Sequence, residues 1–256
     1  MNNEQQHIAE RLARLDRLTA GYEKKLVKAL LRDLQPCIES FELTGSVTLS
    51  AAVLSTNSLK IALESLYLTV IQQEAKIEYL YQLSTQKAFP ILPVNEWLRL
   101  AKNFIAVKSS KAIVAITNTT RKQVRQVLST SLDTGAGIAE TAKNLRNRVT
   151  SFSRSRAKVI SRTELIGAQN YGSYCGAATS GLKLDKVWLT TTDKRTRFSH
   201  IQAGGQRVDI NAPFIVGGET CQFPGDPDLS GAERCNCRCT QIYRPKPTFT
   251  QGVLDF

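Results

Sequence analysis

Apolar residues in the first part of the chain recur at steps of three and four, which is the spacing of one face of an α-helix. The clearest stripe consists of Ile8, Leu12, Leu15, Leu18, Tyr22, Leu26, Leu30 and Leu34. A second stripe runs from residue 50 to about residue 87, and helical spacing continues to about residue 179. Pro36 lies just past the first stripe, and Pro90 and Pro93 interrupt the pattern later, because a helix interior rarely accommodates proline. The spacing predicts a series of amphipathic helices.

The composition changes at Lys183. Residues 183–256 hold five of the eight prolines and four of the six cysteines. The β-branched and aromatic run KVWLTTT (186–192) predicts a strand, and further short strands are expected after it. We expect an α+β fold, in which an extended, mostly helical N-terminal region precedes a small C-terminal α+β module with short strands. The predicted divisions are a helical N-terminal arm (1–90), a basic helical region (91–182), the small module (183–245) and a tail (246–256).

Positive charge is concentrated in one segment. The chain carries a formal net charge of +12, and residues 121–162 contain ten basic and two acidic residues, two-thirds of the excess. A segment of this kind favours a polyanion or an acidic protein as partner, the alternative being a solvated helix face. Aromatic residues do not alternate with the basic ones, so stacking on single-stranded nucleic acid is not indicated.

The composition also bounds the class of protein. The apolar and charged fractions, 42% and 22%, are those of a globular chain. The apolar runs are far shorter than the roughly 20 residues that span a bilayer, and the charged N-terminus does not resemble a secretion signal. We therefore expect a protein made in a cytoplasm, without a membrane partner. Cys37 and Cys175 stand alone in helical segments and are expected to be small buried hydrophobes, whereas Cys221 lies upstream of a cysteine cluster.

His200 is the one histidine placed for chemistry, because the only other one, His7, lies in the first predicted helix. The chain has no GxSxG elbow, P-loop or HExxH motif, and no Glu-x-Glu pair of the kind expected in an ADP-ribosylating enzyme. Asp193 and His200 could form an acid–base pair, which leaves a hydrolase as a third hypothesis. No nucleophile stands out, so we do not expect an enzyme.

Near the C-terminus, every other residue of the run CNCRC is a cysteine: Cys235, Cys237 and Cys239. Zinc prefers Cys and His in tetrahedral sets, but alternate residues of a straight strand lie about 6.5–7 Å apart, so the strand would have to bend. The candidate ligands of a zinc ion are His200, Cys237 and Cys239, with Cys235, Cys221 or Asp193 as the fourth. The alternative is a set of reduced structural cysteines beside a hydrogen-bonded His200.

Two further stretches predict rigid local structure. Asp193 and Arg197 are four residues apart, so a helical turn would let the carboxylate of Asp193 accept a bidentate contact from Arg197. Pro224 and Asp226 belong to the run Pro-Gly-Asp-Pro, which predicts a tight turn. We interpret both stretches as rigid local structures that stabilise a small domain with a limited core.

A set of motifs in fixed order resembles one family. The motif ISRTE, which contains Arg162, Thr163 and Glu164, is followed by D-x-R-T-R-x-x-H from Asp193 to His200. The runs PGDP (224–227) and NCRCT (236–240) come after it. Over about residues 120–243, this order is similar to the phage Mu F-like minor head proteins of tailed bacteriophages, also called phage head morphogenesis proteins.

The resemblance implies a structural protein of the virion rather than an enzyme. Such a protein is expected in the phage head near the portal vertex, and is assembled in the cytoplasm of the bacterial host. The implied partners are the portal protein, the major capsid or scaffold protein, and packaged double-stranded DNA. The implied roles are procapsid assembly and genome retention or ejection. The second hypothesis is a basic nucleic-acid-binding module with a Cys/His metal centre.

Some members of the family carry Cys-x-x-Cys and His-x-x-Cys-x-Cys, which resemble a zinc site. In this chain the first of those cysteine positions is Arg197, and the upstream histidine position is Arg234. The resemblance therefore implies only a partial site, in which an ion pair between Asp193 and Arg197 replaces some of the ligands.

Overall fold

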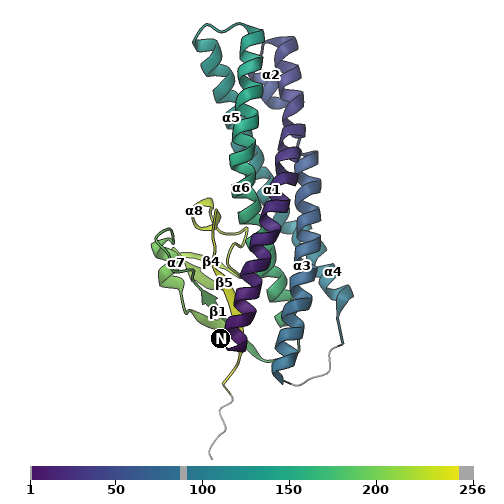
Figure 1. The fold of residues 1–256 in the computed structure, drawn as a ribbon, viewed down its shortest axis with the longest axis vertical. Helices are drawn as coiled ribbons and strands as arrows, with labels where there is room; N and C mark the ends of the chain where they lie inside the picture. The colour runs from purple at the N-terminus through teal and green to yellow at the C-terminus, as the bar shows by residue number, and fades with distance from the viewer. Residues whose placement is uncertain (1, 87–90, 248–256) are drawn as a thin grey trace, which may run out of the picture.

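The structure is a computed structural model that describes residues 2–86 and 91–247 (Figure 1). Its first part is an elongated helical body with the helices α1 (Asn3–Thr44), α2 (Val47–Ala52), α3 (Asn57–Gln86), α4 (Val94–Phe104), α5 (Ser110–Asp133) and α6 (Ile138–Ala178). A π-helical turn, Ile105–Ser109, joins α4 to α5. Among the described residues, no helix is both long and apolar enough to cross a membrane.

The second part is a small module beside the lower half of the helical body (Figure 1). Its elements are β1 (Leu184–Leu189), α7 (Phe198–Ala203), β2 (Arg207–Asp209), β3 (Phe214–Val216), β4 (Glu219–Cys221), α8 (Gly231–Arg234) and β5 (Thr240–Pro245). One antiparallel sheet has the strand order β2-β1-β5, with Trp188 opposite Gln241, and β3 pairs with β4. The α+β class, with a long helical N-terminal region and a few short strands, is confirmed.

The first helix is longer than the sequence predicts. α1 passes through Pro36 and ends only at Thr44, where Gly45 caps it with a left-handed φ of 61°. The reason is that Cys37, Ile38 and Phe41 continue the buried stripe beyond the proline. Burial of a large apolar side chain contributes about 1.5–3 kcal/mol, so together these residues outweigh the roughly 3 kcal/mol that a proline costs inside a helix.

The last helix of the body is also longer than expected. The sequence predicts a short helix near Gly137 and a separate one from about residue 153 to 179. The structure has one continuous helix, α6, from Ile138 to Ala178, because Leu145, Val149 and Ala157 form a buried row across the expected gap. The basic segment therefore lies along the outer part of α5 and α6.

α3 and α6 pack closely against each other at two glycines. Gly172 and Gly176, one helical turn apart, face the backbone of α3. An added Cβ atom would lie 2.6 Å from the carbonyl oxygen of Ile71 at Gly172, and 2.2 Å from that of Ala75 at Gly176. Glycine at both positions lets the two backbones approach.

One buried core contains residues of both predicted helical segments, the arm (1–90) and the basic region (91–182). Leu26 and Leu63, from the predicted arm, lie in the same buried cluster as Trp97 and Leu165, from the predicted basic region. The division of the chain into an arm, a basic region, a module and a tail stays a prediction. Most of the predicted tail, residues 248–256, lies outside the described residues.

Candidate functional site

The structure brings His200, Cys237 and Cys239 together in the interior of the module. His200 lies on the inner side of α7, and both cysteines lie in the bent segment that leads into β5; all three side chains are buried. The Nδ1 atom of His200 is 3.3 Å from Sγ of Cys239 and 3.7 Å from Sγ of Cys237. Their ligand atoms all lie within 4.8 Å of one another. The bend that the sequence required for such a cluster is present, because Asn236 takes a left-handed φ of 57°.

The electrostatics of this cluster favour a thiolate beside an imidazolium. The hydrogen bond from Cys237, followed by the one with His200, lowers the pKa of Cys239 to about 5. The hydrogen bond with Cys239 and burial together raise the pKa of Cys237. Burial opposes protonation of His200, but its contacts with Cys239 and Glu233 raise its pKa overall. One negative charge is therefore held at Cys239, with His200 as its partner.

The three residues suit a metal ion in their chemistry. A thiolate, a thiol that can lose its proton and an imidazole nitrogen are the donors that zinc prefers. On the other side of the ring, Nε2 of His200 lies 3.0 Å from a carboxylate oxygen of Glu233, although off the line of a hydrogen bond. A carboxylate in that place orients a ligating histidine. The residues present therefore fit a zinc ion with three protein ligands.

Cys235 and Asp193 do not join this group. The side chain of Cys235 is exposed, and its carbonyl oxygen accepts a hydrogen bond from Arg197 at 2.5 Å. Asp193 accepts two hydrogen bonds from Arg238, one of them at 2.7 Å. These bonds, with that from the backbone of Arg195, lower the pKa of Asp193. The expected Asp193–Arg197 pair was wrong, because the chain forms a turn here and α7 begins only at Phe198, so the helical spacing does not apply.

A nucleophilic dyad of Cys239 and His200 would need space for a substrate. The hollow lined by His200, Cys237, Cys239 and Arg197 has a volume of only about 10 Å³. That space holds an ion or a water molecule. The arrangement is suited to stabilising the module rather than to binding and turning over a substrate.

The motif residues on α6 hold the module against the helical body. Thr163 accepts a hydrogen bond from the backbone N–H of Asn236 at 3.0 Å. Glu164 is buried, accepts a hydrogen bond from the Tyr67 hydroxyl at 2.8 Å and pairs with Arg234. Arg162, beside them, is half-buried. Arg234, at the histidine position of the family pattern, therefore makes an ion pair with α6 rather than a metal contact.

The Pro-Gly-Asp-Pro turn makes a second junction with α6. The carbonyl oxygen of Pro224 accepts a hydrogen bond from the side chain of Asn170 at 2.9 Å. Asp226 accepts hydrogen bonds from the backbone N–H groups of Gln222 and Asp228, at 2.9 and 3.1 Å. These contacts make the turn rigid and place it against the helix.

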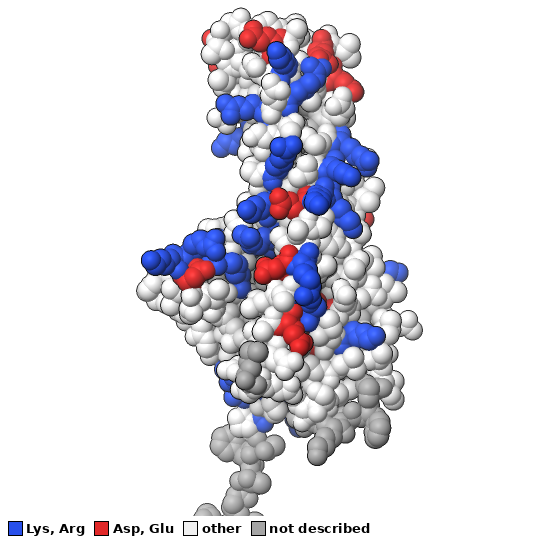
Figure 2. Space-filling view, viewed as in Figure 1, with Lys and Arg blue, Asp and Glu red and all other residues white. Residues whose placement is uncertain are grey.

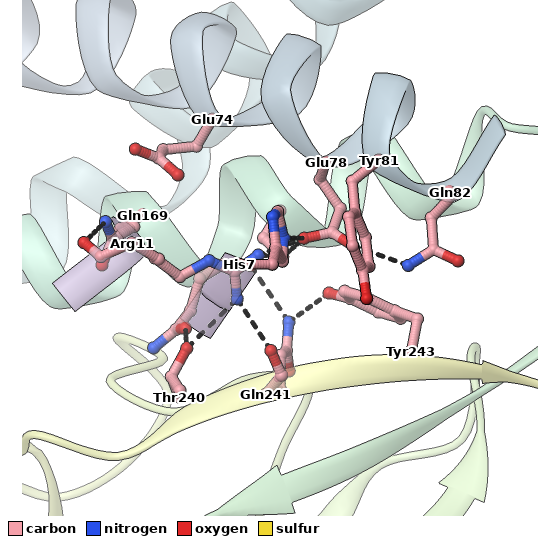
Figure 3. Close-up of polar contacts among 12 residues, drawn as sticks. His7, Arg11, Glu74, Glu78, Tyr81, Gln82, Gln169, Thr240, Gln241 and Tyr243 are labelled. Carbon is pink, nitrogen blue, oxygen red and sulfur yellow. Dashed lines mark hydrogen bonds and ion pairs between the residues drawn. The ribbon is translucent and has the colours of Figure 1, made fainter. Parts of the chain in front are cut away.

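A buried ionic cluster joins the start of α1 to α3, α6 and β5, and the sequence did not predict it (Figure 3). The guanidinium group of Arg11 pairs with Glu78 and donates hydrogen bonds to the carbonyl oxygen of Gln241 at 2.7 Å and to the Ser173 hydroxyl at 2.5 Å. The Nε2 atom of His7 lies 3.1 Å from the Glu78 carboxylate. The available signal was the spacing of His7, Arg11 and Leu15, which puts two polar residues on the buried row of α1.

We expect zinc at close to one ion per chain in the purified protein, measured by elemental analysis. His200→Ala and Cys239→Ser should each abolish it, because each removes one of three ligands. Cys235→Ser should retain the metal, since that side chain is exposed; its loss would make Cys235 a ligand. Chelation should also lower the melting temperature, because an ion that binds only the folded chain stabilises it. A metal-free protein with an unchanged melting temperature in chelator would leave the Cys239–His200 ion pair as the whole of the site.

One family model and several known proteins are similar to parts of this chain. Residues 122–242 match the family model described as Phage Mu protein F like protein. The chain is similar to the uncharacterized protein YqbB of Bacillus subtilis (strain 168), with 28% identity over 167 residues, 64% of this chain and 54% of that protein. It is also similar to the minor head protein GP7 of Bacillus phage SPP1, with 28% identity over 124 residues, 47% of this chain and 39% of that protein.

A third relative carries the name of an enzyme. The NAD(+)--arginine ADP-ribosyltransferase EFV of Enterococcus faecalis (strain ATCC 700802 / V583) is 32% identical over 136 residues, 52% of this chain and 28% of that protein. The chain thus matches about half or less of the length of these curated relatives. No solved structure matches the chain.

Proposed function

Through residues 122–242 the chain belongs to the family of Phage Mu protein F like proteins, and we propose on this basis that it is a structural minor protein of a tailed-phage head. The similarity to the minor head protein GP7 supports the same role. The motif residues Thr163 and Glu164 of α6 hold the module to that helix, and Asp226 fixes the Pro-Gly-Asp-Pro turn. That arrangement supports a protein that acts by binding other head components.

The proposed place of action is the portal vertex. The protein would associate with the portal during procapsid assembly, with the major capsid or scaffold protein as a further partner, and would act in genome retention or ejection. The outer end of the helical body suits docking. Leu43 is 86% exposed and Leu49 is 56% exposed, where α1 turns into α2. Exposed apolar residues that lie close together are a common mark of a protein interface.

The activity in the name of EFV is not part of this proposal. The chain matches 28% of that protein, and it has no Glu-x-Glu pair. The hollow beside His200 has no room for a nicotinamide cofactor. Binding, rather than catalysis, is the function that the geometry supports best.

We expect the protein to co-elute with the portal protein encoded by the same genome when the two are co-expressed and separated by size. The double variant Leu43→Ser/Leu49→Ser should weaken this association at least about tenfold, because it removes the apolar contact area that the two leucines would contribute. Phe198→Ser is the matched control, since Phe198 is 74% exposed but lies in the module. Deletion of residues 1–90 is unsuitable, because it removes α1 and α3 from the core.

Two results would contradict the proposal. Failure of the wild-type protein to bind the portal would remove the portal as partner. Loss of binding in Phe198→Ser, with retention in the double variant, would move the docking surface from the outer end of the helices to the module.

A further inference from the structure

α5 and α6 form a hairpin with a groove of about 660 Å³ along its outer half. Side-chain amides and hydroxyls line most of it: Gln123, Gln126 and Thr130 on α5, and Asn144, Asn147 and Ser151 on α6. Val127 and Phe152 supply its apolar part, and Arg148 lies at its edge. The lining therefore combines neutral hydrogen-bonding groups with a similar share of apolar surface.

Two exposed rows of hydrogen-bond donors run along α5 and α6, and Gln126, Thr130, Asn147 and Ser151 of these rows line the groove. The row on α6 advances by three or four residues per step and consists of Lys143, Asn147, Ser151, Arg154 and Lys158. The row on α5 consists of Thr119, Lys122, Gln126 and Thr130. Residues at such steps share one helix face, with about 5.4 Å between turns. Neither row contains a carboxylate, so a donor is presented at each turn without a competing negative charge.

The cations beside the groove are available to a ligand. Among the residues that the structure describes, no carboxylate forms an ion pair with Lys122, Arg148, Arg154 or Lys158. Arg146 behaves differently, because it pairs with Glu42 of α1. Lys and Arg gather along the upper body in the space-filling view, with acidic residues mainly at its tip (Figure 2). Among the described residues, unpaired positive charge thus lies along the hairpin and also on α1, where Lys24, Lys25 and Lys28 form no ion pair.

Hydrogen bonds between α6 and α5 fix the spacing of the two helices that form the groove. The guanidinium group of Arg156 donates hydrogen bonds across the hairpin to the Thr120 hydroxyl at 2.7 Å, the Gln123 side chain at 3.0 Å and the carbonyl oxygen of Ile116 at 2.8 Å. These contacts tie α6 to α5 at the inner end of the groove. The spacing between the two donor rows is therefore set before any ligand binds.

We propose that this groove binds the sugar–phosphate backbone of double-stranded DNA. Phosphates are contacted by Arg and Lys together with Asn, Gln, Ser and Thr, which is the set of side chains present. An acidic protein helix would instead require a mostly apolar groove. The near absence of aromatic residues fits a duplex better than a single strand. The inference rests on the proposed role in the phage head, because it names the surface that would face the packaged genome.

The test is binding of a fluorescent 30-base-pair duplex to the full chain between 50 and 200 mM salt. The triple variant Arg148→Gln/Arg154→Gln/Lys158→Gln should bind at least about tenfold more weakly at the lowest salt. The slope of log affinity against log salt should become shallower by about 0.9 for each phosphate that the variant no longer neutralises. The matched control is Lys24→Gln/Lys25→Gln/Lys28→Gln, which removes the same charge from exposed residues of α1 and should leave both quantities nearly unchanged.

Three outcomes would overturn the proposal. They are the absence of DNA binding by the wild-type protein at 50 mM salt, equal weakening in the two triple variants, and equally strong binding of polyglutamate, which would assign the groove to an acidic protein. Co-elution with the portal is measured on the same samples. Absence of DNA binding by the wild-type protein, with portal binding retained, would reject the groove alone, whereas DNA binding without portal binding would reject the portal role.

Discussion

Gly176→Ala is expected to destabilise the protein by about 3 kcal/mol or more, although alanine is the better helix former by about 1 kcal/mol. The new Cβ atom would lie 2.2 Å from the carbonyl oxygen of Ala75 and 2.9 Å from the backbone nitrogen of Tyr79. Both are backbone atoms of α3, so no side chain can rotate away. Overpacking of a well-packed core typically costs about 1–3 kcal/mol, and here two whole helices must separate.

Gly21→Ala is the matched control, because it makes the same chemical change in another long helix. An added Cβ at Gly21 meets no atom within 4 Å. This variant should therefore be more stable than the wild type by about 0.5–1 kcal/mol. Urea unfolding measures both, with the shift in midpoint compared at an unchanged slope. A Gly176→Ala variant that is as stable as the wild type, or more stable, would show that α3 and α6 do not meet at Gly176.

The helices were predictable because their evidence is local. Leu15, Tyr22 and Leu26 lie on one face at helical steps, and all three are buried in the structure. The ends were not predictable from local rules alone. Pro36 signals a stop, yet Phe41, five residues further on, is buried against other helices, and this tertiary contact decides where α1 ends.

The candidate site was predictable in part because its residue types are rare. A chain with two histidines and three clustered cysteines offers few combinations, and His200, Cys237 and Cys239 do meet. The place of Glu233 beside His200, and the choice of Arg238 over Arg197 as partner of Asp193, depend on how turns and strands are arranged. Sequence spacing contains no such information.

The sequence did not predict the Arg11 cluster, for a related reason. Arg11 and Glu78 are 67 residues apart, and the partners on β5 are some 230 residues away. Nothing in the sequence pairs them. Only the burial row of α1, in which His7 and Arg11 precede Leu15, indicated that a charged group would need a partner inside the protein.

Arg11→Leu is expected to destabilise the protein by about 3–5 kcal/mol at pH 7, because it leaves the Glu78 carboxylate buried without its cation. Both side chains are only 2% exposed. Arg244→Leu is the matched control: Arg244 of β5 pairs with Glu4 of α1 at 2.9 Å, but on the surface, where such pairs contribute about 0.2–1 kcal/mol. Urea unfolding of the two variants beside the wild type gives both differences.

The pH dependence separates a missing charge partner from simple loss of packing. In the wild type, burial raises the pKa of Glu78, but Arg11 and His7 lower it overall. That stabilisation is present above the unfolded-state pKa of about 4.3 and is lost as the pH falls through the folded-state value. Without Arg11, burial favours the protonated acid and only His7 and Gln82 remain to oppose it, so the deficit of Arg11→Leu should shrink between pH 7 and pH 5. The double variant Arg11→Leu/Glu78→Gln should be more stable than Arg11→Leu at pH 7, with little pH dependence of its own. An Arg11→Leu deficit that is equal at both pH values, and unrelieved by Glu78→Gln, would show that Arg11 acts through packing and not through its charge.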